Sequence, residues 1–177
     1  MKIPTLLCVG LLTFAGVVFA AADSKSGPPP AYKGSPEFER IKALAGTWKG
    51  QATMEQGPME VVAEYRVVGN GSAVEERLFP GTPMEMVTVY HDRAGKLSLT
   101  HYCSLANQPV MKLKSADTKA IQLELDANAG IDSSQAKHMH ALKISFDGPD
   151  TMTQNWTMFD GGQPQIHNRF TLKLVKA

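Results

Sequence analysis

Histidine and cysteine occur at alternating positions in two separate segments of the chain. His101 and Cys103 are two residues apart in "LSLTHYCSL", and His138 and His140 are two apart in "HMHALKISF". Because side chains alternate across a β-strand, each pair is expected to share one face, with the two imidazoles of His-x-His roughly 6–7 Å apart. Imidazole and thiolate are donors that zinc and copper favour. If their strands bring them together, the four residues form a metal site at the rim of an enclosed space.

Other interpretations of the same residues remain open. The histidines and Cys103 can form a polar rim that contacts a bound molecule, or they can be structural groups that hydrogen-bond to one another and to loop backbone. Methionine supplies further soft donors, and Met84, Met86, Met111 and Met139 could add thioether ligands for copper.

Further inward-facing candidates follow from alternation in neighbouring segments. Tyr90, Gln154 and Trp156 each lie an even number of positions from apolar residues of their own segment, so they are expected to share a strand face with them. Apolar walls with a few convergent polar groups are typical of small-molecule sites. Glu76 falls on an apolar face as well, and a buried carboxyl beside histidines is a candidate general base. No phosphate loop, Ser-His-Asp order, paired-glycine fingerprint or Cys-x-x-Cys is present. The sequence therefore favours binding over catalysis and assigns no catalytic residue.

The elements that position these side chains are β-strands joined by short turns. After Gly46 apolar and polar residues alternate, and turn signals such as Asn70-Gly71 recur at short intervals. Beyond two strands within 47–68, the pattern predicts strands over 73–79, 84–91, 96–103, 110–115, 120–126, 137–146, 151–159 and 165–175. About ten consecutive strands predict an all-β fold, a closed antiparallel up-and-down barrel that removes its edges and encloses an interior.

A short helix is predicted before the first strand. Ser35 is a suitable N-cap, Pro36 suits the first helical position, and Phe38, Ile41 and Leu44 form one apolar stripe. We expect this helix to plug the barrel, with Trp48 packed at the same end.

The N-terminus has the pattern of a secretory signal peptide over residues 1–22. Lys2 precedes an uncharged apolar run, and Ala20-Ala21-Ala22 supplies small residues for cleavage. An uncleaved membrane anchor is the competing interpretation. Residues 23–35 are polar and proline-rich, and they predict a disordered linker before a domain over 36–177. We expect an exported protein, periplasmic or secreted, with no membrane span after cleavage.

Charge and cysteine content narrow the classes of partner. Removing Lys2 with the leader lowers the 18 basic residues to 17, equal to the 17 acidic residues. A neutral chain lacks the basic excess of nucleic-acid-binding proteins, so no nucleic-acid partner is expected. Cys103 would be the single cysteine after cleavage, so no internal disulfide is expected.

The motifs of the predicted domain carry a family resemblance. "LAGTW", with a helix before it and strands after it, resembles the opening of calycin barrels, which include lipocalins, fatty-acid-binding proteins and nitrobindin-like haem proteins. The longer set "GTWKG", "FPGTPMEMVTVYHD", "LTHYCSLANQPVMKL" and "HMHALKISF" resembles a family of exported bacterial proteins with no assigned activity. The first resemblance implies a ligand-binding barrel. Its nitrobindin-like branch implies haem held by one histidine near the chain end, where His167 is the match by position.

Taken together, the sequence predicts an exported barrel that holds a small, mainly apolar ligand inside. Its expected polar contacts are Tyr90, His101, Cys103, His138, His140, Gln154 and Trp156. One alternative is a metal- or haem-dependent protein, possibly an enzyme, that uses the His/Cys rim, with zinc or copper favoured over haem. The other is a structural or partner-binding barrel with a filled interior. Ligand identity and oligomeric state are not encoded in these patterns.

Overall fold

A computed structural model describes residues 29–54 and 57–177, which form one α-helix and ten β-strands. The elements are α1 (Pro36–Lys42), β1 (Gly46–Met54), β2 (Gly57–Val68), a 3-10 turn η1 (Gly69–Gly71), β3 (Ala73–Leu78), β4 (Met86–Arg93), β5 (Lys96–Tyr102), β6 (Val110–Ala116), β7 (Ala120–Leu125), β8 (His138–Gly148), β9 (Thr151–Asp160) and β10 (Gln163–Lys176). The predicted all-β fold with one short N-terminal helix is confirmed.

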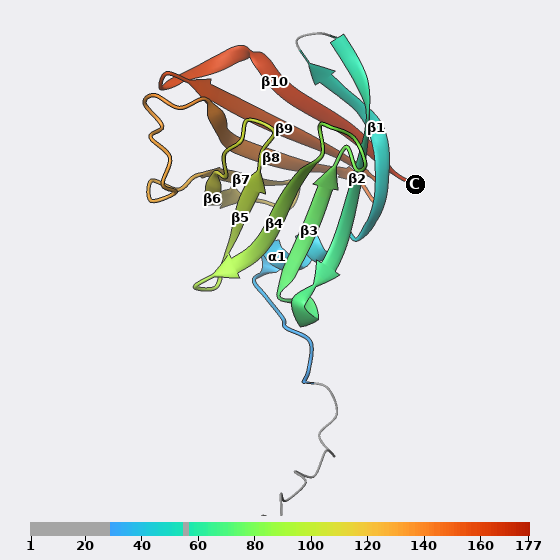
Figure 1. The fold of residues 1–177 in the computed structure, drawn as a ribbon. Coiled ribbons are helices and arrows are strands. Elements are labelled where there is room, and N and C mark those ends of the chain that lie inside the picture. The colour runs from blue at the N-terminus through green and yellow to red at the C-terminus, as the bar shows by residue number, and fades with distance from the viewer. Residues whose placement is uncertain (1–28, 55–56) are drawn as a thin grey trace, which may run out of the picture.

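Each strand pairs antiparallel with the next one along the chain, and the last strand returns to the first (Figure 1). β10 closes the barrel against β1, with Trp48 opposite Lys176 and Ala52 opposite Leu172. Closure satisfies the backbone groups that an open sheet leaves unpaired at its edges. The predicted closed up-and-down barrel is therefore confirmed.

Alternation of side chains fills the barrel interior. Along β9 every second residue is buried, from Met152 through Gln154 and Trp156 to Met158. β3 follows the same rule, with Val74, Glu76 and Leu78 buried between half-buried neighbours. The pleat thus sends one set of side chains into the core and the other toward water. Polar residues among the inward set are the exceptions that a functional site has to explain.

Helix α1 covers one end of the barrel, here called the helix end (Figure 1). The Ser35 hydroxyl caps the helix by accepting a hydrogen bond from the Phe38 backbone N–H at 3.2 Å. Phe38 and Ile41 are completely buried, and the Trp48 indole N–H donates to the Leu44 carbonyl at 2.8 Å. The helix is a hydrophobic plug, as its apolar stripe predicts.

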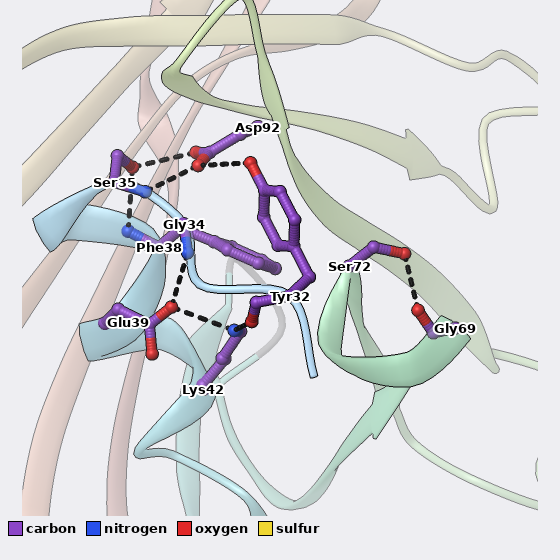
Figure 2. A network of polar contacts seen from close by, with 9 residues as sticks. All are labelled: Tyr32, Gly34, Ser35, Phe38, Glu39, Lys42, Gly69, Ser72 and Asp92. Carbon is purple, nitrogen blue, oxygen red and sulfur yellow. Dashed lines mark hydrogen bonds and ion pairs between the residues drawn. The ribbon is translucent and has the colours of Figure 1, made fainter. Parts of the chain in front are cut away.

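Residues 29–35, here called the strap, run along the helix end and are fastened to it. Asp92 at the end of β4 accepts hydrogen bonds from the Ser35 backbone N–H at 2.6 Å, the Ser35 hydroxyl at 2.8 Å and the Tyr32 hydroxyl at 3.3 Å (Figure 2). The Tyr32 N–H donates to the Asn70 carbonyl, and Lys42 donates to the Tyr32 carbonyl. A side chain at Gly34 would collide with Phe38 and Asp92, so the chain passes here only as glycine.

The strap is the part of the predicted linker that the structure describes. Residues 29–35 are hydrogen-bonded to the barrel, because Asp92 and Asn70 supply polar partners that the composition of the segment does not reveal. Residues 23–28 and the predicted signal peptide over 1–22 lie outside the described residues. Among the helices of the described chain, none has the length and apolar character needed to cross a membrane.

Candidate functional site

The end of the barrel opposite α1, here called the loop end, carries the longer connections. The segments 79–85, 103–109 and 126–137 join β3 to β4, β5 to β6 and β7 to β8 there. Beneath them lies a cavity of about 60 Å³. Its walls are mostly apolar, and it is lined by Ala52, Leu78, Phe79, Met84, Met86, His101, Ser104, Met139, Trp156 and Leu172.

His101 is the one imidazole in this cavity wall. It is only 1% exposed, its Nδ1 lies 2.9 Å from the Thr88 hydroxyl oxygen, and its ring lies 4.5 Å from the Trp156 ring between centroids. Burial lowers the pKa of His101 from 6.5 to about 4, because the low-dielectric interior disfavours the charged form. The contact with Thr88 engages Nδ1, so Nε2 is the other nitrogen of this buried ring. His101 thus offers a neutral imidazole nitrogen to whatever occupies the cavity.

Phe79 forms part of the cavity wall in a conformation that is rare for an aromatic residue. Its φ of 54° lies in the left-handed region, where a bulky side chain is strained. Its backbone N–H donates to the Val62 carbonyl at 3.0 Å, and its carbonyl accepts from Thr82 N–H, so the turn holds it in place. The strain turns the ring toward the cavity, where Phe79 is 8% exposed.

Cys103 lies at the start of the β5–β6 connection, next to the cavity-lining Ser104. It is a buried free thiol, and its backbone N–H donates to the Asn107 carbonyl at 3.0 Å. Burial raises the pKa of the Cys103 thiol, so it stays protonated and uncharged. The neighbouring Asn107 donates its amide to the Lys137 carbonyl at 2.8 Å, but its Oδ1 is buried without a partner among the described residues.

A row of polar side chains runs across four neighbouring strands below the cavity. The register places Tyr65 of β2 opposite Glu76 of β3, Glu76 opposite Thr88 of β4, and Thr88 opposite His101 of β5. Directly opposed residues of antiparallel strands project from the same face, so all four enter the barrel together. The row links the cavity imidazole to the buried carboxyl group of Glu76.

Glu76 is fully buried and is surrounded by hydrogen-bond donors. Its Oε1 accepts from the Tyr65 hydroxyl at 2.8 Å and from the Gln154 amide, and its Oε2 accepts from the Tyr90 hydroxyl at 2.7 Å. The Gln154 amide also contacts the Tyr65 hydroxyl, and the Trp156 indole N–H donates to Gln154 Oε1 at 2.9 Å. Burial raises the pKa of Glu76, and the donors around it oppose that rise.

The position of Glu76 suits structure better than catalysis. Both oxygens are engaged, and the residue is absent from the cavity lining. Its network instead fixes the Tyr65, Tyr90 and Gln154 side chains, and through Gln154 it holds the Trp156 ring that forms the cavity wall.

His138 and His140 take a different place from the one predicted. Met139 pairs with Met158 and Ala141 pairs with Thr157, so His140 is an extra residue in β8, a β-bulge. Leu142 and Met139 therefore both face inward, while the histidines lie on the other face. His138 pairs with Phe159, His138 Nε2 lies 3.1 Å from His140 Nδ1, and the His140 ring stacks on Phe159 at 3.8 Å. The expectation that both histidines share a face with Leu142 is wrong. The extra residue in the bulge shifts the alternation of side chains, so the residues before it face the opposite side from the one predicted.

The predicted site residues therefore fall into three groups. His101 and Trp156 line the cavity, and Cys103 lies beside it. Tyr90 and Gln154 do face inward, but they are bound to Glu76 one layer deeper. His138 and His140 lie on the face of β8 turned away from the cavity, where His138 is fully buried and His140 is half-buried, and the side chain of His167 lies outside the described residues. The predicted meeting of His101 and Cys103 with the His138–His140 pair at one opening is not formed.

Sequence reasoning missed several contributors to the cavity, among them Thr88, Phe79 and Ser104. Thr88, which orients His101, was detectable because it shares a face with Tyr90 two residues later. Phe79 and Ser104 lie in turns, where alternation gives no signal. Within residues 29–54 and 57–177, no group of three or more His, Cys, Asp or Glu side chains is placed to hold a metal ion.

Comparison with known proteins adds no identity to this geometry. No protein-family model matches the chain, and no curated protein matches it. The ten-stranded closed barrel is consistent with the calycin-like architecture, and that architecture alone supports the resemblance.

Proposed function

We propose that the protein binds a small, mainly apolar molecule in the cavity at the loop end and acts after export from the cytoplasm. The observation that carries the binding proposal is a mainly apolar cavity with one neutral imidazole, that of His101, in its wall. A polar group in an apolar wall favours a ligand that pairs with it, and the remaining walls favour a ligand that is mainly apolar.

The volume of the cavity limits the ligand. An apolar cavity of ~150 Å³ holds benzene, and sites for drug-sized molecules are roughly 300–1,000 Å³. The cavity here is about 60 Å³, so it accepts a group of a few non-hydrogen atoms. A longer molecule would place that group against His101 and extend outward between the connections of the loop end.

A series of straight-chain alcohols from ethanol to octanol tests the proposal. Their hydroxyl can pair with His101 Nε2 while the chain contacts the methionine and phenylalanine walls. We expect saturable binding by calorimetry, with a shift of the His101 ring proton resonances in NMR spectra. Affinity should rise with chain length until the cavity is filled.

Two alanine variants supply the matched control. Ala52→Val adds two methyl groups inside the cavity and should abolish binding, whereas Ala141→Val adds them on the outer side of β8 and should leave binding unchanged. Absence of binding across the whole series, or equal binding by Ala52→Val, would overturn the proposal and favour a barrel with a filled interior.

A further inference from the structure

The cavity at the loop end has three methionines and one histidine in its wall. Met84, Met86, Met139 and His101 all line it. Thioether and imidazole are both ligands of copper(I), and thioether in particular selects soft ions over zinc or magnesium. We propose that this cavity is a copper(I) site whose ligands are these four residues. The inference rests on the cavity of the proposed function, but it concerns the donor atoms of the walls rather than their apolar character.

The backbone explains how donors distant in sequence reach one place. Met86 begins β4 opposite the inward-facing Leu78, and Met84 lies just before it in the connection 79–85 above the cavity. Met139 comes from the far side of the barrel, where the β-bulge at His140 turns it inward. Without that extra residue, alternation from Leu142 would have placed His140 inside and Met139 outside. The bulge thus exchanges an imidazole for a thioether in the cavity wall.

The charges around the cavity favour a monovalent ion. The four ligands carry no negative charge, and Glu76 is engaged by Tyr65, Tyr90 and Gln154 below. A divalent ion in an apolar site without a carboxylate or thiolate leaves two charges uncompensated, which is strongly unfavourable. Copper(I) carries one charge and is stable with neutral sulfur and nitrogen ligands.

The surroundings of His101 suit a ligand role. Nδ1 is engaged by the Thr88 hydroxyl, which fixes the ring orientation, so Nε2 is the ring nitrogen that would bind the ion. Trp156 lines the same cavity, so a bound cation would lie near an indole ring, which both attracts a cation and reports its presence by fluorescence. The volume of about 60 Å³ is also better matched to one ion than to a drug-sized organic molecule.

The experiment is an anaerobic titration of the full chain with copper(I) in the presence of the chromophoric chelator bicinchoninate. All proteins carry Cys8→Ser, so that the leader thiol does not compete. We expect one copper(I) bound per chain, quenching of Trp156 emission, and X-ray absorption spectra with both sulfur and nitrogen neighbours. The triple variant Met84→Leu, Met86→Leu, Met139→Leu keeps the side-chain volumes and should lose at least about 100-fold in affinity.

Met111→Leu is the control, because Met111 is fully buried in the core but does not line the cavity. It should bind copper(I) as the parent does, and circular dichroism should show every variant folded. Parent protein that cannot compete with the chelator, or a triple variant that binds equally well, would overturn the copper site. Alcohol binding that persists in such a protein would leave the proposed function standing. Loss of alcohol binding in a protein that still holds copper(I) would overturn the proposed function and leave the copper site standing.

Discussion

At the helix end of the barrel, Phe38 and Ile41 are completely buried, and the strap saturates both oxygens of Asp92 with donors (Figure 2). At the loop end, the Phe79 ring borders a cavity, and Asn107 Oδ1 is buried without a partner among the described residues. The buried aromatic ring and the carboxylate at the helix end are thus fully surrounded by partners, whereas the loop end has an aromatic ring beside a cavity and an unpaired buried oxygen.

The two ends of the barrel therefore differ in what they contribute to stability. Tight packing and paired polar groups stabilise a fold, whereas a cavity and unpaired buried atoms cost stability. Strain at Phe79 adds to that cost at the loop end. Such costs are typical of sites where a ligand supplies the missing contacts, and this is why we propose that binding takes place at the loop end.

The largest expected effect compares one phenylalanine at each end. Phe38→Ala removes a completely buried ring and should lower the free energy of unfolding by about 3–5 kcal/mol. Phe79→Ala should cost less than half of that, because this ring already borders empty space. Urea unfolding followed by tryptophan fluorescence measures both values. Equal costs would mean that the two ends are packed alike.

The second effect is a pH dependence that originates at the loop end. The folded protein keeps His101 neutral down to about pH 4, whereas the unfolded chain takes up the proton near pH 6.5. The contribution of His101 is therefore present above pH 6.5 and is lost as the pH falls toward 4, by about 3 kcal/mol in total. Unfolding free energies measured from pH 4 to 8 should show this slope in the parent and not in His101→Gln.

The difference between those two proteins is the quantity to compare. Glu76 has a raised pKa, so its own contribution changes in the opposite sense, decreasing as the pH rises from 4.5. Because Glu76 is present in both proteins, its effect cancels. An identical pH profile for parent and variant would show that His101 is hydrated rather than buried.

The smallest effect concerns the strap at the helix end. Asp92→Asn weakens three hydrogen bonds to Tyr32 and Ser35 and should cost about 1–2 kcal/mol. Tryptic cleavage at Lys33, timed by mass spectrometry, should accelerate about tenfold if the strap detaches. Asp147→Asn, which alters an exposed hydrogen bond to Thr153 instead, should leave the cleavage rate at Lys33 unchanged.

Regular strands allowed much of the interior to be predicted from sequence. Alternation correctly placed Tyr90, His101, Gln154 and Trp156 inside, because β4, β5 and β9 keep the same parity across these positions. β8 broke the rule through a bulge at His140, and no glycine or proline marks that bulge in "HMHALK". A single extra residue was enough to move two histidines out of the site and one methionine into it.

The shape of the cavity was harder to predict than the side chains that face the barrel interior. The shape of the cavity depends on Phe79, whose left-handed backbone conformation is set by the turn that follows it. The sequence "FPGT" predicts a turn, but it does not predict that the aromatic residue adopts a strained conformation. The network around Glu76 likewise depends on cross-strand register, which places Tyr65 opposite Glu76 and brings Gln154 from another strand. Sequence periodicity gives the face of each strand but not its offset from its neighbours.

The strap places the N-terminal end of the described chain at one particular end of the barrel. Residue 29 is tied to the turn at Asn70, at the end farthest from the cavity (Figure 1). A dye attached at residue 29 would therefore report on the plugged base of the molecule, while a dye on the 79–85 connection would report on its mouth.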